Sequence, residues 1–225
     1  MNKYILALFI VLATLSSCIK DNSHGSSPTY GSVLDIDNNL YHTIKIGTQT
    51  WTQENLKTTH YRNGDSIPNI TDVIQWENNI TGAYCNYNND SGNGNTYGHL
   101  YNWYSINNPA GLCPPGWHIP SDSEWDILIN YLGGQSTAGG AMKAVSQWNM
   151  PNTDANNISG LTIFPGGGRS QSAIFGDIGY HGAFWSSTGN DSTTALYLNV
   201  NFDNSQVYHY FYPKLAGFSS RCVKD

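Results

Sequence analysis

Charged side chains are scarce in this chain: Asp, Glu, Lys and Arg together make up 12% of its 225 residues. Basic residues are the scarcer kind, 10 against 16 acidic ones, and they form no stripe or cluster. Proteins that bind nucleic acids need grouped Lys and Arg to neutralise phosphates. We therefore expect no nucleic-acid partner and a surface covered mostly by neutral polar groups.

Long apolar runs are also scarce, and the one near the start, residues 4–15, is shorter than the ~20 residues of a membrane-spanning helix. Lys3 precedes this run and small residues follow it, which is typical of a secretory signal peptide over residues 1–17. Leu15-Ser16-Ser17-Cys18 resembles a bacterial lipobox, in which the Cys18 thiol takes a diacylglyceryl group and the chain is cleaved before it. An ordinary secreted protein with an incidental early cysteine is the alternative.

A lipid anchor on Cys18 predicts attachment at the outer membrane or the cell surface, because each buried methylene contributes roughly 0.8 kcal/mol. Ile19-Lys20-Asp21 resembles the export signal of Bacteroidetes surface lipoproteins, with one acid in place of a run. Residues 18–30 are polar and indicate a flexible tether. Residues 1–17 hold one basic and no acidic residue, so the remainder has 9 basic and 16 acidic residues, a net charge of −7. Residues 31–225 are long enough for one domain, which we expect to be monomeric.

The clearest helix signal lies just after Pro120. Ser121 and Glu124 have the spacing of a capping box, in which each side chain accepts a hydrogen bond from the other residue's amide. Gly133-Gly134 predicts the C-terminal end of this helix. Between these limits apolar residues recur at helical spacing: Trp125, Leu128, Ile129 and Leu132. The pattern predicts a three-turn helix with one buried face.

Strand patterns lie on both sides of this helix. Residues 33–36 and 40–46 flank a hairpin signal, and in the second run Leu40, His42, Ile44 and Ile46 share one face that predicts burial. A second, shorter helix is indicated over residues 138–145, and residues 57–80 have little periodicity. The C-terminal third predicts four strands: 184–188, 194–200, 206–211 and 218–223. Helices between two groups of strands indicate an α+β fold.

Two segments rich in glycine allow both a chemical and a structural interpretation. Residues 84–95 offer Asn and Asp oxygens that suit calcium, but short polar side chains also tolerate turns, and the EF-hand spacing is absent. Residues 164–170, FPGGGRS, suggest a phosphate loop but lack its Lys-Ser/Thr ending. A tight turn that brings backbones together is the preferred interpretation of the second segment.

Six segments in a fixed order resemble the Fibrobacter succinogenes major paralogous domain. They are IGTQTWTQENL (46–56), YGHLYNWYSIN (97–107), GLCPPGWHIPSDSEWDILINYLGG (111–134), FPGGGRS (164–170), FWSST (184–188) and GFSSRCVKD (217–225). The resemblance covers residues 31–225, and Asn86 departs from it where the family usually has an aromatic. It implies a C-type-lectin-like fold, with two short helices packed on a small antiparallel sheet and long irregular loops. Formylglycine-generating enzymes share this fold.

The chain has four cysteines, and lipidation of Cys18 would leave Cys85, Cys113 and Cys222 in an oxidising compartment. The stabilisation expected from loop-closure entropy does not distinguish well among the three possible bridges. A loop of ~110 residues contributes roughly 4.8 kcal/mol and a loop of ~30 residues roughly 3.6. The family resemblance implies a disulfide between Cys113 and Cys222, with Cys85 buried and free.

No catalytic motif is present: the chain lacks a G-x-S-x-G elbow, an H-E-x-x-H pair and the late pair of cysteines of formylglycine-generating enzymes. We expect no enzymatic activity and no cofactor other than calcium. An extracellular ligand-binding module is favoured, with a saccharide as ligand. A structural or protein-interaction subunit of a cell-envelope assembly is the alternative, and an oxidoreductase like the formylglycine-generating enzymes is a third. A binder should show a concave patch of Tyr, Trp and Asn, whereas a structural subunit should show an apolar or unpaired strand edge.

In the fold that the chain resembles, ligand contacts come from long irregular segments on one side. The resemblance therefore implies ligand-binding residues in three such segments: Asn88, Asn89, Asp90, Arg169, Trp185, Asn190 and Asp191. Together they offer amides, a guanidinium and carboxylates that suit sugar hydroxyls, with aromatic neighbours for stacking. The alternative is that Arg169 pairs with a carboxylate and that the Asn residues hold turns.

Overall fold

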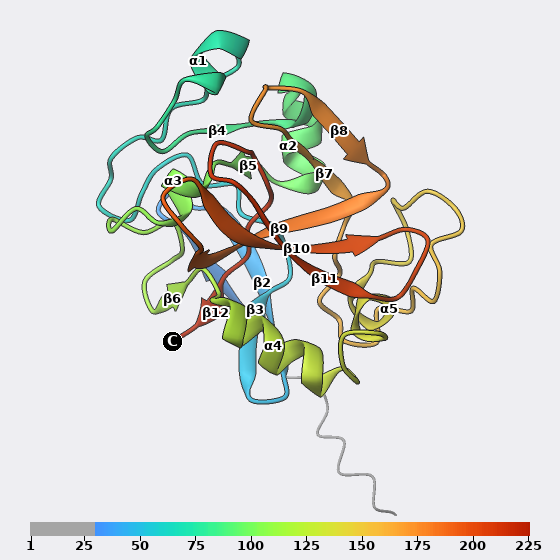
Figure 1. The fold of residues 1–225 in the computed structure, drawn as a ribbon. Helices are drawn as coiled ribbons and strands as arrows, with labels where there is room; N and C mark the ends of the chain where they lie inside the picture. The colour runs from blue at the N-terminus through green and yellow to red at the C-terminus, as the bar shows by residue number, and fades with distance from the viewer. Residues whose placement is uncertain (1–29) are drawn as a thin grey trace, which may run out of the picture.

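The computed structural model describes residues 30–225, and in this part of the chain no helix is both long and apolar enough to cross a membrane. The predicted signal peptide, Cys18 and all but the last residue of the tether lie outside the described residues. Figure 1 shows a mixed α/β architecture with two curled sheets and a few short helices.

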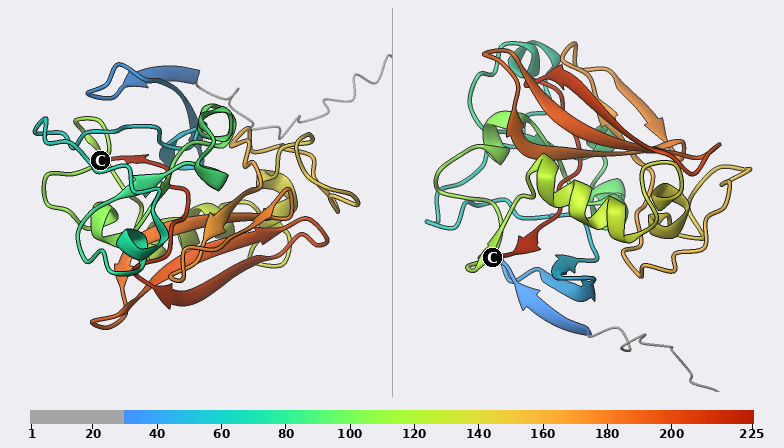
Figure 2. Two further views of the ribbon diagram at one scale, coloured as in Figure 1. Left: turned by 90° about the horizontal axis from the view of Figure 1, so that it is seen from above. Right: turned by 60° about the horizontal axis from the view of Figure 1, so that its bottom comes forward.

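The first sheet joins the two ends of the described chain. Its strand order is β1-β2-β3-β12-β6, and every recorded pairing in it is antiparallel. Figure 2 shows the C-terminus beside this sheet. The strands are β1 (Tyr30–Leu34), β2 (Leu40–Ile46), β3 (Gln49–Thr52), β6 (Trp117–His118) and β12 (Val223–Lys224).

The second sheet has the order β11-β10-β9-β7-β8. Only β7 and β9 pair in parallel, at Gly167 and Gly182. Its strands are β7 (Gly166–Arg169), β8 (Phe175–Ile178), β9 (His181–Gly189), β10 (Thr194–Asn201) and β11 (Val207–Pro213). The period-two pattern predicted for β10 is confirmed, because the side chains of Leu196, Leu198 and Val200 all lie on one face of the strand and pack in the core.

The predicted capping box is confirmed at the start of α4 (Asp122–Tyr131), the longest described helix. The Glu124 amide donates to Ser121 Oγ at 3.4 Å, and the Ser121 amide donates to Glu124 Oε2 at 2.8 Å. The other helices are short: α1 (Val73–Glu77), the 3₁₀ helix η1 (Tyr87–Asn89), α2 (Ser91–Tyr97), α3 (Trp103–Ile106) and α5 (Ala138–Met142). A small strand pair, β4 (Tyr84–Cys85) and β5 (Leu100–Tyr101), lies between them.

The main core lies between the two sheets and α4. Trp125 of α4 is within 4.6 Å of Trp51 in the first sheet and 6.0 Å of Phe184 in the second, measured between ring centroids. Leu128 and Ile129 complete the buried face of the helix. Burial of aromatic rings at this depth is the largest apolar contribution available to a domain of this size. Trp125 of α4 therefore packs against both sheets in one core.

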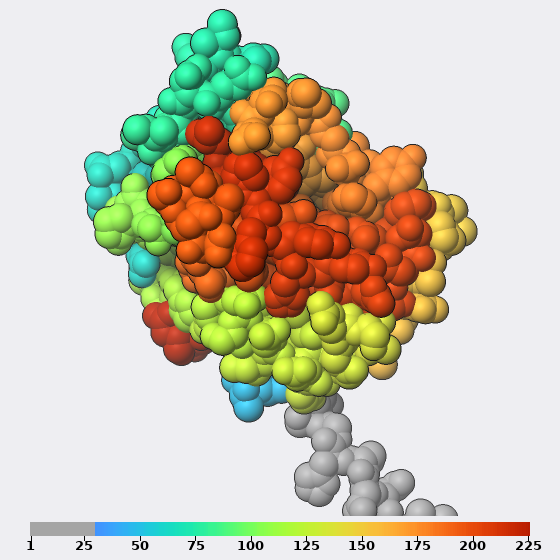
Figure 3. Space-filling view, viewed as in Figure 1, coloured from blue at the N-terminus to red at the C-terminus, as the bar shows by residue number. Residues whose placement is uncertain are grey.

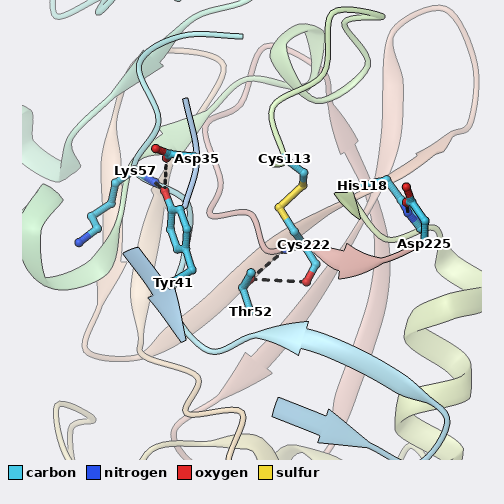
Figure 4. Close-up of a disulfide and its surroundings, with 8 residues drawn as sticks. All are labelled: Asp35, Tyr41, Thr52, Lys57, Cys113, His118, Cys222 and Asp225. Atoms are coloured by element: carbon cyan, nitrogen blue, oxygen red, sulfur yellow. Dashed lines mark hydrogen bonds and ion pairs between the residues drawn. A yellow bond between two sulfur atoms is a disulfide. The ribbon is translucent and has the colours of Figure 1, made fainter. Parts of the chain in front are cut away.

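The disulfide implied by the family resemblance is present. Cys113 and Cys222 are joined, with their Cα atoms 5.9 Å apart, and Cys85 is free and buried. Figure 4 shows the bridge beside Thr52, whose hydroxyl accepts from the Cys222 amide at 3.1 Å. The bridge links the segment before α4 to the last strand of the first sheet.

Several local predictions are wrong. The two large sheets have five strands each, more than the small sheet expected, and the described residues contain five α-helices where two were expected. Within residues 164–170, Gly166–Arg169 form strand β7 in place of a turn, although backbones do approach closely there. His42 is exposed and pairs with Glu54, because the opposite face of β2, with Tyr41 and Thr43, is buried at this end.

Candidate binding groove

A groove of about 470 Å³ lies on the concave face of the second sheet. Figure 3 shows its mouth between the atoms of the β8 region (orange, above) and those of β10 and β11 (red, below). We call it the tyrosine groove. Its lining residues are Gly167, Gly168, Arg169, Ser170, Ile174, Phe175, Gly176, Asp177, His181, Ala183, Tyr197, Asn199, Asn201, Tyr210, Tyr212 and Phe218.

The alternation of β10 builds the floor of this groove. Leu196, Leu198 and Val200 point into the main core, so the residues between them point to the opposite face. Tyr197 is paired with Tyr210 on β11. The remaining outward residues are Asn199 and Asn201. One face of β10 therefore carries aliphatic side chains, and the other carries a tyrosine and two asparagines.

Glycines in β7 allow the sheet to curl. Gly167 has φ +61°, a conformation that other residues rarely adopt, and a Cβ there would overlap the backbone of Gly176. A Cβ on Gly168 would lie 2.8 Å from the ring of Phe218. Because these positions have no side chain, β8 can pair closely with β7, and all four residues of β8 except Ile178 line the groove. The run of three glycines therefore shapes the groove and carries no phosphate-loop geometry.

Aromatic rings form one wall. Tyr197 lies 5.8 Å from Tyr210 and 4.5 Å from Phe218, and Tyr208 stacks on Tyr210 at 5.7 Å with an interplanar angle of 7°. Tyr210 is 46% exposed, so much of its ring faces solvent. Burial raises the pKa of Tyr197 to about 12, and the nearby Tyr212 and Tyr210 add to the shift. Its hydroxyl is therefore a neutral donor and acceptor at physiological pH.

The two amides of the floor leave one polar atom without a partner. Asn199 Nδ2 donates to Asn201 Oδ1 at 2.5 Å. Asn199 is only 6% exposed, and its Oδ1 accepts no hydrogen bond from any described residue. A buried acceptor without a donor costs about 1–3 kcal/mol. The floor therefore holds an amide with unused hydrogen-bonding capacity.

Arg169 borders the groove, but its guanidinium is turned into the protein. Nη1 donates to the Ile70 carbonyl at 2.7 Å, Nη2 to the Thr71 carbonyl at 3.2 Å, and Nε to the Ala173 carbonyl at 3.4 Å. The residue is 1% exposed and its guanidinium lies over the ring of Trp76 at 4.3 Å. These contacts give Arg169 a structural role at the edge of the groove, and the alternative that it pairs with a carboxylate is wrong for the described residues.

Trp185 is also not a contact residue. Its side chain has no exposed surface, and its Nε1 donates to the Tyr101 carbonyl at 2.8 Å. The ring packs on Phe218 at 4.8 Å, directly behind the aromatic wall. The FWSST segment thus supports the groove without lining it, because its tryptophan is satisfied internally.

The predicted Asn-rich segment lies outside the groove. Asn88 and Asn89 are exposed and have φ of 54° and 56°, and Asn89 Nδ2 donates to the Thr71 carbonyl. Asp90 is the N-cap of α2 and accepts from the Gly92 amide at 2.8 Å. The expected loop is therefore a 3₁₀ turn followed by a capped helix, and these side chains hold local structure.

Asn190 and Asp191 hold the turn between β9 and β10. Asp191 Oδ1 accepts from the amides of Thr193 and Thr194, both at 2.7 Å, and these bonds lower its pKa. Lys214 Nζ donates to the Asp191 carbonyl at 2.6 Å. Neither Asn190 nor Asp191 lines the groove, so the structure does not bring the predicted residues into one site.

Metal-ligating side chains gather elsewhere in the described chain. Asp122 and Asp126 of α4 flank His209 of β11, with His209 Nδ1 2.6 Å from Asp122 and Nε2 3.7 Å from Asp126. The histidine lies between two carboxylates, and the arrangement ties α4 to the edge strand of the second sheet. Asp90 is not part of this group.

The residues that line the groove were missed, although their pattern is visible in the sequence. Tyr197, Asn199 and Asn201 alternate with core residues in β10, and Tyr210 and Tyr212 continue an alternation in β11 that begins with Tyr208 outside the groove. Such alternation predicts an outer face with a distinct composition. That this face is concave depends on β8, which the sequence pattern did not predict.

Comparisons with known proteins give one result. Searches of curated proteins and of solved structures find no match. The family model for the Fibrobacter succinogenes major domain matches residues 44–224, which includes all of the second sheet and most of the first. Because that match covers most of the chain, the protein belongs to the Fibrobacter succinogenes major domain family.

Proposed function

We propose that this protein is an extracellular binding module and that its ligand is a saccharide held in the tyrosine groove. The observation that carries the proposal is the pairing of half-exposed tyrosines with two amides on a concave face. Sugar rings present apolar C–H faces, which suit aromatic rings, and hydroxyls, which suit amides and phenols. A groove of about 470 Å³ is within the ordinary range for small-ligand sites.

Attachment to a membrane through a lipidated Cys18 is part of the same proposal. The support comes from the lipobox pattern, which lies outside the described residues. A C-type-lectin-like fold is likewise proposed, and the meeting of the first and last strands in one sheet and the long-range disulfide are consistent with it. We propose no enzymatic role, since burial raises the pKa of the Cys85 thiol to about 11 and the other two described cysteines are joined.

A protein-interaction role in a cell-envelope assembly is the second candidate. Strand β1 is an edge strand, and Tyr30, Leu34 and Leu40 on the same face of its hairpin are 64%, 51% and 49% exposed. Exposed apolar edge strands are common sites of strand addition by a partner. This surface is in the first sheet, separate from the groove, so the two candidates can be tested independently.

Saccharide binding is tested with the full-length chain in detergent micelles on a panel of immobilised glycans, with and without calcium. Tyr210→Ala should weaken binding about tenfold, which corresponds to about 1.4 kcal/mol. Phe211→Ala is the matched control, because Phe211 is the next residue, 56% exposed and on the opposite face of β11. The idea fails if no glycan binds in either condition, or if the Tyr210 variant binds as well as the Phe211 variant.

A further inference from the structure

The ionisable side chains at the groove determine what charge a ligand can carry. Besides the tyrosines, the groove is lined by Arg169, Asp177 and His181. The guanidinium of Arg169 is buried, and three of its five N–H donors bond to backbone carbonyls, so its charge is held inside the protein. The structure thus provides no exposed arginine or lysine among the lining residues.

Asp177 is the exposed charge at the mouth. Its side chain is 64% exposed, and His181 Nδ1 lies 3.7 Å from its carboxylate. The histidine is thus the nearest basic side chain to this carboxylate among those that line the groove. A ligand carboxylate or sulfate entering here would meet a like charge, and no exposed Lys or Arg lines the groove to pair with it.

The floor favours an uncharged ligand for a second reason. The Asn199 amide has an acceptor without a donor, and rotation about its broad terminal torsion can turn that oxygen toward the groove. A hydroxyl or an acetamido N–H supplies the donor that it lacks. A carboxylate or sulfate group at this position brings acceptors only, so the donor for the amide oxygen must come from a hydroxyl elsewhere on such a ligand.

We propose that the tyrosine groove selects uncharged glycan chains and rejects uronic-acid and sulfated ones, with Asp177 as the residue that determines this specificity. The proposal rests on the proposed saccharide-binding function and narrows it to one chemical class. Rejection of the wrong ligand by a like charge is a recognised route to specificity, separate from affinity for the right one.

The test uses matched pairs of ligands and the full-length chain in detergent. Three neutral polysaccharides, a β-glucan, a mannan and a galactan, are each compared with a derivative oxidised at C6 to the carboxylate. The wild-type chain should bind at least one neutral polymer and bind its oxidised form about tenfold more weakly at low salt.

Asp177→Asn should recover part of that loss, about threefold for the oxidised polymer, while binding of the neutral polymer stays the same. Asparagine is chosen because Asp177 has φ +69°, which asparagine also tolerates. Asp203→Asn is the control, since it removes the same charge from an exposed residue outside the groove. The control should change neither affinity.

The outcomes separate the two proposals. Equal or tighter binding of an oxidised polymer by the wild-type chain overturns the charge selection and leaves saccharide binding intact. The same conclusion follows if Asp177→Asn and Asp203→Asn have the same effect. Absence of binding to all six polymers overturns the saccharide proposal, and the selectivity falls with it.

Discussion

Replacing Arg169 with methionine tests whether this side chain is structural, as its burial indicates. The change removes donors from three carbonyls, those of Ile70, Thr71 and Ala173, and leaves these acceptors in a site where Arg169 is 1% exposed. Each unsatisfied buried acceptor costs about 1–3 kcal/mol, and a desolvated cation–π contact adds about 2. Guanidinium–ring distances of 4.3 Å to Trp76 and 4.9 Å to Phe175 fit such contacts.

One contribution to the change in unfolding free energy has the opposite sign. No carboxylate of residues 30–225 pairs with Arg169, so its removal relieves the desolvation of a buried charge, which amounts to several kcal/mol. We therefore expect a net loss of about 3–4 kcal/mol in the free energy of unfolding, within the range seen when a buried charged group is truncated.

The assay is urea unfolding of the full-length chain in detergent, followed by tryptophan fluorescence, with which the buried Trp76 should report directly on this region. Arg62→Met is the control, because Arg62 is exposed and should lose less than about 0.5 kcal/mol. A loss below about 1 kcal/mol at Arg169 would refute the structural assignment. So would a variant with unchanged stability that no longer binds the glycan.

Three further changes have defined outcomes. Replacing both Cys113 and Cys222 with alanine should lower stability by about 4–5 kcal/mol in the chain-entropy model, given a separation of 109 residues, and a peptide map of the wild type under non-reducing conditions should join these two cysteines. Burial, with a contribution from Lys57, lowers the pKa of His99 to about 4. As the pH falls below 6.5, His99 is therefore protonated in the unfolded chain before it is protonated in the folded one. Unfolding free energy should decrease by up to about 3 kcal/mol between pH 6.5 and 4, and His99→Gln should flatten this slope; an unchanged slope contradicts the assignment. Cys18→Ala should abolish fatty-acid labelling and partition into the detergent phase, whereas unchanged membrane retention would contradict the anchor.

Helix α4 and strand β10 were predictable because their signals are local. The capping pair Ser121 and Glu124 is three residues apart, and the alternation of Leu196, Leu198 and Val200 needs no partner strand to be recognised. The family resemblance added the Cys113–Cys222 bridge, which spacing alone left open among three pairings. Each of these features depends on contacts within a few residues or on a pattern shared across a family.

Other predictions failed because local patterns cannot specify what covers a strand. Leu40 and His42 share a face with Ile44, yet they are exposed, since the main core ends before the tip of that hairpin. The glycines of β7 indicate a turn when considered alone. Paired with β8 and β9, the same residues form a strand.

The sequence by itself determined the low charge, the paired faces of β10 and β11, and the start of α4, since these depend on composition and short spacings. Only the tertiary structure decided that Arg169 points inward and that Tyr210 faces a groove. The guanidinium finds its carbonyl partners about a hundred residues earlier in the chain, at Ile70 and Thr71. The groove needs β8 to curl over β10, two strands that are not neighbours in the sheet. Contacts between distant segments decide which polar side chains are satisfied inside the protein and which remain available to a ligand.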